Sequence, residues 1–317
     1  MFSHILVPLD GSRLAETVLP HLVAVATAFG SHATLLRVLE QESGGQTRSV
    51  DPMDWRIARA QAKAYLDEQA NRVAEVGLQV DSALLEGQAA DRIVEHAHSE
   101  GADLILVSSH GRSGLSRWNI SSVVQKIVLQ ARTSIMIVRA YQPAVEDLMG
   151  ERYARLLVPL DTSQRAEVSL SPSVTLARAH DARIILAHVV HVPEMTCPAP
   201  LSEEDRVLAQ RLTERNRRAA VEYLERVRER LGIEGEARIM VSDSPAAALD
   251  ELVDSEGIDL VVISAHGRSG QAKWPYGSVT IGLISYGSTP LIIVQDLPPD
   301  SIEPTKAEVA AREHKGH

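Results

Sequence analysis

The most informative short motif in this 317-residue chain is a basic turn that occurs twice. Residues 110–114 read HGRSG, and residues 266–270 repeat the same five letters. Glycine lets a backbone approach an anion closely, and arginine adds positive charge beside it. The chemistry that these residue types favour is phosphate binding. The alternative is a turn that a gene duplication has kept for its backbone geometry alone.

An aspartate follows the first strand predicted in each half of the chain. Asp10 ends the run ILVPLD, and Asp161 ends the run LLVPLD. A carboxylate does not favour phosphate, but it accepts hydrogen bonds from a ribose hydroxyl or an exocyclic amine. Beyond each HGRSG turn, Ser121 or Gly277 stands before a serine that begins a helix, and a helix N-terminus offers unpaired N–H groups to phosphate. Together these groups indicate a nucleotide.

The residues of this motif must be positioned by strands and helices, and the sequence predicts the same series of elements twice. In the first half, apolar and β-branched runs predict strands near 4–10, 33–39, 80–85, 103–108 and 135–139. Helical patterns lie between them, near 14–29, 53–77, 89–99 and 121–131. Short, continuously apolar strands that alternate with helices are typical of a parallel sheet buried on both faces. The sequence therefore predicts two Rossmann-like α/β domains, each a five-stranded parallel sheet flanked by helices.

The repeat also predicts the domain boundaries. We expect the first domain at 1–142 and the second at 152–296, with a polar linker near 140–154. The Pro-, Glu- and Lys-rich tail at 297–317 is expected to be disordered. In the second half, Ser202 opens a capping pattern that predicts the start of a long helix.

The motifs resemble those of the universal stress protein family in its tandem form, over nearly the whole chain apart from the tail. The VPLD-x-S starts, the SSHGRSG and SAHGRSG turns and the small-Ser step before the fourth helix carry the resemblance. The family implies an adenine-nucleotide-alpha-hydrolase-like fold, and its members with the motif G-x2-G-x9-G-[S/T] bind ATP. Here Ser108 and Ser264 replace the first glycine of that motif, and only the second copy keeps the glycine before the helix.

The resemblance implies equivalent adenine-nucleotide sites in the two copies, with ATP as the nucleotide. In the first copy the implied residues are Pro8, Leu9, Asp10, Val38, Ser108, His110, Gly111, Arg112, Gly114, Ser121, Ser122 and Val123. In the second copy they are Pro159, Leu160, Asp161, Val189, Ser264, His266, Gly267, Arg268, Gly270, Gly277, Ser278 and Val279. By the same resemblance the aspartates would contact the adenosine end of the ligand. Any Mg²⁺ would arrive with the phosphates, because the sequence shows no dedicated carboxylate cage.

The two sites are expected to differ at the residue before the fourth helix. If that position needs a positive φ, Gly277 adopts it freely, whereas Ser121 pays a steric cost of about 1–2 kcal/mol. Gly11 of the first copy is in turn more permissive than Thr162 of the second. We therefore expect ATP binding in at least the second domain, about tenfold tighter than in the first.

A stress-response sensor or signalling protein is the function that these features predict. The alternative from another class is an interaction module of the same fold that binds no nucleotide. A slow ATPase, or a protein that phosphorylates itself on Ser122 or Ser278, is the third possibility. The sequence shows no nucleophile and base to support it, and His110 and His266 are interpreted as residues that hydrogen-bond the turn or line the pocket.

The composition narrows the partners. A formal net charge of −10 argues against a nucleic-acid surface, and no apolar stretch approaches the length of a membrane span. A single cysteine, Cys197, and an N-terminus without signal-peptide features favour the cytoplasm. The last strand of each copy is an apolar edge, so we expect residues 134–139 and 290–295 to pair the two domains within the chain. A homodimer through another surface remains open.

Overall fold

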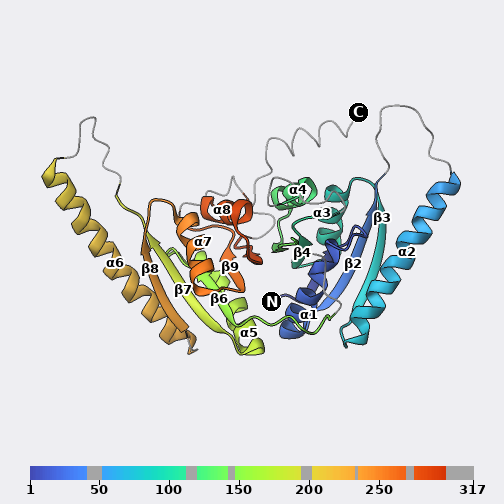
Figure 1. Ribbon diagram of the computed structural model, residues 1–317, viewed down its shortest axis with the longest axis horizontal. Coiled ribbons are helices and arrows are strands. Elements are labelled where there is room, and N and C mark those ends of the chain that lie inside the picture. Colours follow the sequence, from blue (N-terminus) through green and yellow to red (C-terminus); the bar gives the residue numbers. More distant parts are fainter. Residues whose placement is uncertain are drawn as a thin grey trace. The chain divides into compact units, whose positions relative to one another are not determined.

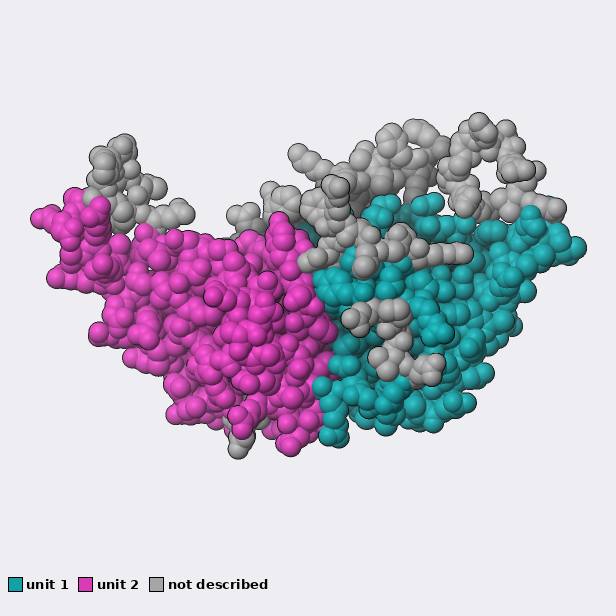
Figure 2. Space-filling model, viewed as in Figure 1, with its two compact units in different colours: residues 1–152, 272–275, 297–317 teal, residues 153–271, 276–296 magenta. Residues whose placement is uncertain are grey.

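The computed structural model describes residues 1–40, 52–111, 120–141, 147–193, 202–232, 235–268 and 275–297. The chain divides into two compact units (Figure 2). Met1–Arg152 make up most of the first unit, and residues 153–271 and 276–296 form the second. The expected disordered tail lies outside the described residues, apart from Leu297.

The first unit contains the predicted series of strands and helices. Its strands are β1 (His4–Pro8), β2 (His32–Leu39), β3 (Val80–Glu86), β4 (Leu104–Ser108) and β5 (Ser134–Val138). Its helices are α1 (Val18–Phe29), which a short 3-10 helix (Ala15–Thr17) precedes, α2 (Pro52–Glu75), α3 (Ala89–Ser99) and α4 (Ser122–Gln130). The strand order in this unit is β3-β2-β1-β4-β5, with every pair parallel.

The second unit repeats this series. Its strands are β6 (Arg155–Pro159), β7 (Arg183–Val190), β8 (Gly235–Val241), β9 (Leu260–Ser264) and β10 (Leu291–Val294). Its helices are α5 (Leu170–His180), which a 3-10 helix (Ala166–Ser169) precedes, α6 (Glu203–Leu231), α7 (Pro245–Glu256) and α8 (Ser278–Tyr286). The strand order is β10-β9-β6-β7-β8, again parallel. The predicted fold class is therefore confirmed for both units.

The central strands form because their side chains are apolar on both faces of the sheet. All five residues of β4 and all five of β9 are buried. Burial on both faces requires a layer of helices on each side. In each unit the first two helices cover one face and the last two cover the other, because the chain reverses its direction across the sheet after the third strand. Figure 1 shows this for the second unit, where α6 lies on the outer side of β8 while α7 and α8 lie on the other side.

The longest helix, α6, begins where the sequence predicts. The Ser202 hydroxyl oxygen accepts a hydrogen bond from the Asp205 N–H at 3.1 Å, and the Ser202 N–H donates to Asp205 Oδ2 at 3.1 Å. This reciprocal capping box satisfies two backbone donors and confirms the predicted cap. The hydrogen bond from Ser202 lowers the pKa of Asp205, so the carboxylate stays charged beside the positive end of the helix.

The reversal of chain direction places a crevice between β6 and β9 in the second unit. In an open parallel sheet, such a switch point at the carboxyl ends of the strands is the usual position for a ligand. The helices α7 and α8 pack closely together: a Cβ at Gly282 of α8 would lie 2.6 Å from the Cβ of Ala246 of α7. The topology thus points to this end of the second unit.

Candidate functional site

A cavity of about 150 Å³ lies at this switch point in the second unit. Its lining combines strand ends, the glycine turn and two helix starts. The lining residues are Pro159, Leu160, Asp161, Ala166, Ala187, Val189, Pro245, Leu249, Ile263, Ser264, His266, Gly267, Gly277, Ser278, Val279 and Thr280. The structure therefore brings together ten of the twelve site residues that the sequence implies for this copy. Of the other two, Arg268 lies next to Gly267, and Gly270 falls outside the described residues.

Six of the lining residues are not among the predicted ones. They are Ala166, Ala187, Pro245, Leu249, Ile263 and Thr280. They are wall residues rather than motif residues, and most are apolar. The position of α7 after β8 could have pointed to Pro245 and Leu249, because at a switch point the helix that follows the third strand covers the crevice.

Asp161 lines the cavity and accepts three hydrogen bonds from neighbouring groups. Its Oδ1 accepts hydrogen bonds from the Ser163 N–H at 3.0 Å and from the Ser163 hydroxyl at 2.6 Å. Its Oδ2 accepts a hydrogen bond from the backbone N–H of Arg268 at 2.5 Å. The family resemblance implies that this carboxylate contacts the adenosine end of a ligand, which stays a prediction; the structure shows that it binds the backbone of the glycine turn.

The contact between Asp161 and the turn explains why the turn has glycine. A Cβ added at Gly267 would lie 2.1 Å from Asp161 Oδ2, which is far inside van der Waals contact. The first unit has the same arrangement, since a Cβ at Gly111 would lie 2.1 Å from Asp10 Oδ2. The repeated glycine is thus required by a neighbouring carboxylate.

Strain lies in the loop after Asp161. Thr162 has a φ of 69°, a left-handed conformation that is uncommon for a β-branched residue. Gly11, its counterpart in the first unit, has a φ of 83° and pays no such cost. A hydrogen bond from the Arg268 guanidinium to Thr162 Oγ1 at 2.5 Å stabilises the strained loop.

The expected strain at the start of the fourth helix is wrong. Ser121 and Gly277 both have φ −71° and ψ 161°, an extended conformation that any residue adopts. The reason is a hydrogen bond that pins both residues: the Ser121 N–H donates to Ser109 O at 2.7 Å, and the Gly277 N–H donates to Ala265 O at 2.8 Å. The penalty of about 1–2 kcal/mol predicted for Ser121 therefore does not arise.

The two helix starts do differ, but in their capping. The Ser121 hydroxyl oxygen accepts a hydrogen bond from the Val124 N–H at 3.3 Å, which satisfies one of the donors at the start of α4. Gly277 makes no side-chain cap on α8. The first turn of α8 therefore keeps donors that an anion can use.

Ser121→Ala is expected to lower the free energy of unfolding of the first unit by about 1 kcal/mol, because it removes this cap. Urea denaturation followed by hydrogen exchange in α4 would measure the change. Gly277→Ser is the matched control, since it adds a hydroxyl at the same backbone geometry and should stabilise α8. Equal stability of Ser121→Ala and the unmodified chain would show that the 3.3 Å contact contributes nothing.

Both histidines of the glycine turns are buried and hydrogen-bonded. His266 Nδ1 lies 2.7 Å from Asp296 Oδ1, and Arg165 Nε lies 3.3 Å from the other oxygen of Asp296. His110 Nδ1 instead lies 3.0 Å from the Ser109 hydroxyl. His266 lines the cavity, which is one of the two roles interpreted for it, but the partner of its ring Nδ1 is Asp296, which lies outside the turn. Asp296 and Arg165 could not be predicted as partners, because both are distant from the turn along the chain.

The serines that replace the first motif glycine also hold the turns. The Ser264 hydroxyl donates to His266 O at 2.7 Å, and the Ser108 hydroxyl lies 2.5 Å from the equivalent acceptor, His110 O. Both serines end central strands and are buried. The replacement therefore supplies a hydroxyl that hydrogen-bonds the backbone at the start of each turn.

The same positions in the first unit end β1 and β4 and begin α4. Pro8 is the last residue of β1, and Ser108 is the last residue of β4. The Ser12 N–H donates to Asp10 Oδ1 at 2.9 Å, as Ser163 does to Asp161. The other predicted residues of this copy follow at the equivalent places: Leu9, Val38, His110, Gly111, Ser121, Ser122 and Val123. Arg112 and Gly114 fall outside the described residues.

A polar cluster ties the long helix to the segment after Asp161. The Tyr223 hydroxyl donates to Glu167 Oε1 at 2.9 Å, and Arg230 donates to Glu167 Oε2 at 2.6 Å. Burial, followed by the hydrogen bond to Glu167, raises the pKa of Tyr223, so the phenol stays neutral. The cluster fixes α6 against the short helix that follows the Asp161 loop.

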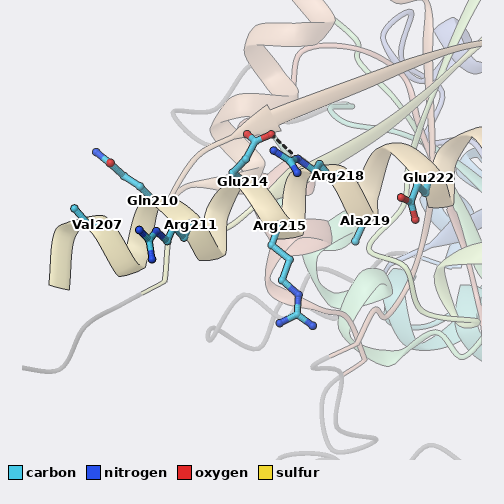
Figure 3. A pocket seen from close by; sticks show the side chains of 8 residues that line it. All are labelled: Val207, Gln210, Arg211, Glu214, Arg215, Arg218, Ala219 and Glu222. Carbon is cyan, nitrogen blue, oxygen red and sulfur yellow. Dashed lines mark hydrogen bonds and ion pairs between the residues drawn. The ribbon is translucent and has the colours of Figure 1, made fainter. Parts of the chain in front are cut away.

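A larger surface hollow, of about 700 Å³, lies along α6 and is drawn in Figure 3. All its labelled residues belong to this one helix: Val207, Gln210, Arg211, Glu214, Arg215, Arg218, Ala219 and Glu222. Arg218 pairs with Glu214 at 3.1 Å within the helix, as expected for a solvated charged face. One helix face does not enclose a ligand, so the switch-point cavity is the candidate site despite its smaller volume.

Membrane-spanning helices and clusters of metal-binding side chains are both absent from the described ranges. None of the described helices is long and apolar enough to cross a membrane. Within the same ranges, no group of three or more His, Cys, Asp or Glu side chains is arranged to hold a metal ion.

The fold defines a class, namely doubly wound α/β proteins, here with two units in tandem and a cavity at the switch point of the second unit. Residues 1–139 and 152–295 each match the model of the universal stress protein family. The chain therefore belongs to the universal stress protein family, as a tandem member.

Individual relatives agree with this assignment. The chain is 24% identical over 155 residues to universal stress protein MJ0577 of Methanocaldococcus jannaschii, which covers 44% of this chain and 96% of that protein. It is 25% identical over 203 residues to universal stress protein Rv2005c of Mycobacterium tuberculosis, covering 62% and 63% of the two chains. A universal stress protein from Archaeoglobus fulgidus has a similar structure, with a TM-score of 0.66, 16% identity, and coverage of 94% of this chain and 100% of that one.

Proposed function

We propose that the second unit binds an adenine nucleotide, ATP, in the switch-point cavity, and that the protein acts as a stress-response sensor. The observation that carries the proposal is that apolar walls and a helix N-terminus without a side-chain cap line the same cavity. Leu160, Val189 and Leu249 supply apolar walls, whereas Gly277 and Ser278 begin α8 at the same cavity. A ligand that matches both is flat and apolar at one end and anionic at the other.

The size of the cavity supports one orientation of the nucleotide. Sites for ligands of this size usually measure about 300–1,000 Å³, so a cavity of about 150 Å³ accepts the base and part of the ribose. The phosphates extend toward the mouth, where the α8 N–H groups and the Gly267 backbone can contact them. Mg²⁺ would be carried by the phosphates, because the described residues hold no carboxylate cluster for it.

A sensor role follows from how the mouth is held together. Asp161 hydrogen-bonds Arg268, and Arg268 hydrogen-bonds Thr162, so the phosphate-facing turn and the loop after β6 form one linked structure. A phosphate that competes for the Arg268 guanidinium would release the strained Thr162 loop. Nucleotide occupancy would in this way alter the surface around the mouth, which a partner protein can recognise.

One observation favours the alternative of an interaction module that binds no nucleotide. Close contact with Asp161 favours glycine at position 267 whether or not a ligand binds. Denaturing freshly purified protein and identifying the released small molecule by mass spectrometry, with calorimetric titration of ATP, separates the two proposals. Binding of ATP with a Kd in the micromolar range or below supports the nucleotide site. If the purified protein releases no nucleotide and binds no ATP added at millimolar concentration, the interaction module is supported.

Asp161→Ala is expected to weaken ATP binding by about 1.5–3 kcal/mol, because it removes a charged hydrogen-bond acceptor and frees the glycine turn. The variant should still fold, since Asp161 lies just after the carboxyl end of β6 and not in the core. Calorimetry on the intact chain gives the affinity, and Asp10→Ala is the matched control in the first unit. Unchanged affinity in a folded Asp161→Ala protein would remove Asp161 from the site.

A further inference from the structure

The position that holds one lining residue of the second unit's cavity carries a different side chain in the first unit. Pro8 of β1 pairs in register with Leu36 of β2, and Pro159 of β6 pairs with Ala187 of β7. Leu36 and Ala187 are therefore equivalent, and both are completely buried. Ala187 lines the cavity of the second unit, so an isobutyl group stands in the first unit where the second has a methyl group.

This position lies next to the strand end that carries the aspartate. The Leu160 N–H donates to Ala187 O at 2.8 Å, and the Leu9 N–H donates to Leu36 O at 2.7 Å. The extra carbons of Leu36 are thus placed on the floor beside Asp10, where the second unit is open. Interiors are packed closely enough that one added methylene is felt by its neighbours.

Other wall positions do not reverse this difference. Ala89 begins α3 where Pro245 begins α7, and Val107 stands in β4 where Ile263 stands in β9. These smaller residues widen two other walls of the first copy. Neither change removes the bulk of the Leu36 side chain at its own position.

The phosphate end of the first copy is closed as well. The Ser121 hydroxyl takes the Val124 N–H, which is a donor that α8 of the second unit leaves to a ligand. The first copy therefore loses space at one end and a backbone donor at the other, while keeping the glycine turn that its own Asp10 requires.

We propose that the chain binds one adenine nucleotide, in the second unit, because Leu36 and Ser121 close the first copy of the site. The proposal rests on the nucleotide-binding function proposed above. The first unit then serves as a scaffold of the same fold whose repeated motif is retained for architecture, and Ala187 and Leu36 are the residues that determine which copy accepts the base.

Equilibrium dialysis of the full chain with radiolabelled ATP tests the stoichiometry. The expected result is one ATP for each chain. Ala187→Leu transfers the floor residue of the first copy to the second and should weaken binding by at least about tenfold, with a smaller effect from Ala187→Val. The matched control is Ala237→Leu: Ala237 pairs with Leu186 on the opposite face of the same sheet, so this change should leave affinity unaltered. The double variant Leu36→Ala with Ser121→Gly should bind a second ATP.

Melting temperatures of all variants show whether each one folds. If Ala187→Leu does not fold, the affinity of Ala187→Val still tests the proposal. Two ATP molecules bound to the unmodified chain would overturn the inference and leave the proposed function intact. Unchanged affinity in folded Ala187→Leu would overturn it too. ATP binding by none of the proteins would contradict the proposed function itself, and the inference with it.

Discussion

Gly267→Ala is expected to weaken ATP binding by about 100-fold. The added Cβ would lie 2.1 Å from Asp161 Oδ2, so the carboxylate has to move. It cannot move without breaking the hydrogen bonds from Ser163 and from the Arg268 N–H, and with them the position of the turn. Calorimetric titration with ATP measures the loss.

A double variant identifies the cause. If the clash with Asp161 explains the effect, adding Gly267→Ala to Asp161→Ala should cost little beyond Asp161→Ala alone, because contacting residues are not additive. Gly111→Ala is the matched control, since it meets Asp10 Oδ2 at the same 2.1 Å in the first unit. It should leave ATP affinity in place. Full additivity of the two changes at 161 and 267 would refute the explanation by steric clash.

The first unit is expected to lose about 3 kcal/mol of stability between pH 7 and pH 4 through His21 alone. Burial lowers the pKa of His21 from its ordinary 6.5 to about 4. Glu151 lies 3.7 Å away and would act in the opposite direction, but its side chain is one-third exposed, so burial dominates. The folded state therefore binds this proton less readily than the unfolded state, and stability falls as the pH drops from about 6.5 to about 4.

A second buried histidine adds to this effect with the same sign. The pKa of His4 is also lowered, first by burial and then by His32, whose ring stacks on it at 4.1 Å. The corresponding position in the second unit is Arg155, which pairs with Glu256 at 2.6 Å. Acid lability through these histidines is thus a property of the first unit.

Urea-dependent hydrogen exchange of peptides from α1, at pH 7 and near pH 4.5, measures the expected loss. His21→Leu should remove most of the His21 contribution, because leucine does not titrate. His98→Gln, on the exposed side of α3, is the control for removing a histidine. A pH dependence in His21→Leu as steep as in the unmodified chain would show that His21 is not the titrating group.

The site could be found in the sequence because its parts are local motifs. The end of a strand, a glycine turn and a helix start each have a short signature, and parallel topology brings the carboxyl ends of strands to one edge. That logic placed Asp161, Gly267 and Gly277 together without coordinates. The apolar walls from α7 carry no residue motif, so Leu249 and Pro245 could be reached only through the topology, which predicts that the helix after the third strand covers the crevice.

The backbone geometry of the site could not be inferred from residue types. Glycine at 277 suggested a positive φ, but a hydrogen bond to Ala265 O holds that residue extended, and Ser121 is held in the same way. The left-handed residue is Thr162, whose type argues against that conformation. Loop dihedrals are set by the hydrogen bonds that close the loop, and the acceptors for Ser121 and Gly277 lie at the far end of the same loop, after β4 and β9.

What the sequence by itself determined is the repeat, the strand and helix series, and the residues at the strand ends. These depend on hydrophobic periodicity and short-range turn chemistry, both of which are local. Only the tertiary structure decided what those residues contact: Asp161 on the Gly267 turn, Asp296 on His266, and Ala187 in the lining of the cavity. The physical reason is that these contacts join segments distant along the chain, whose register and side-chain packing are fixed only when the sheet assembles.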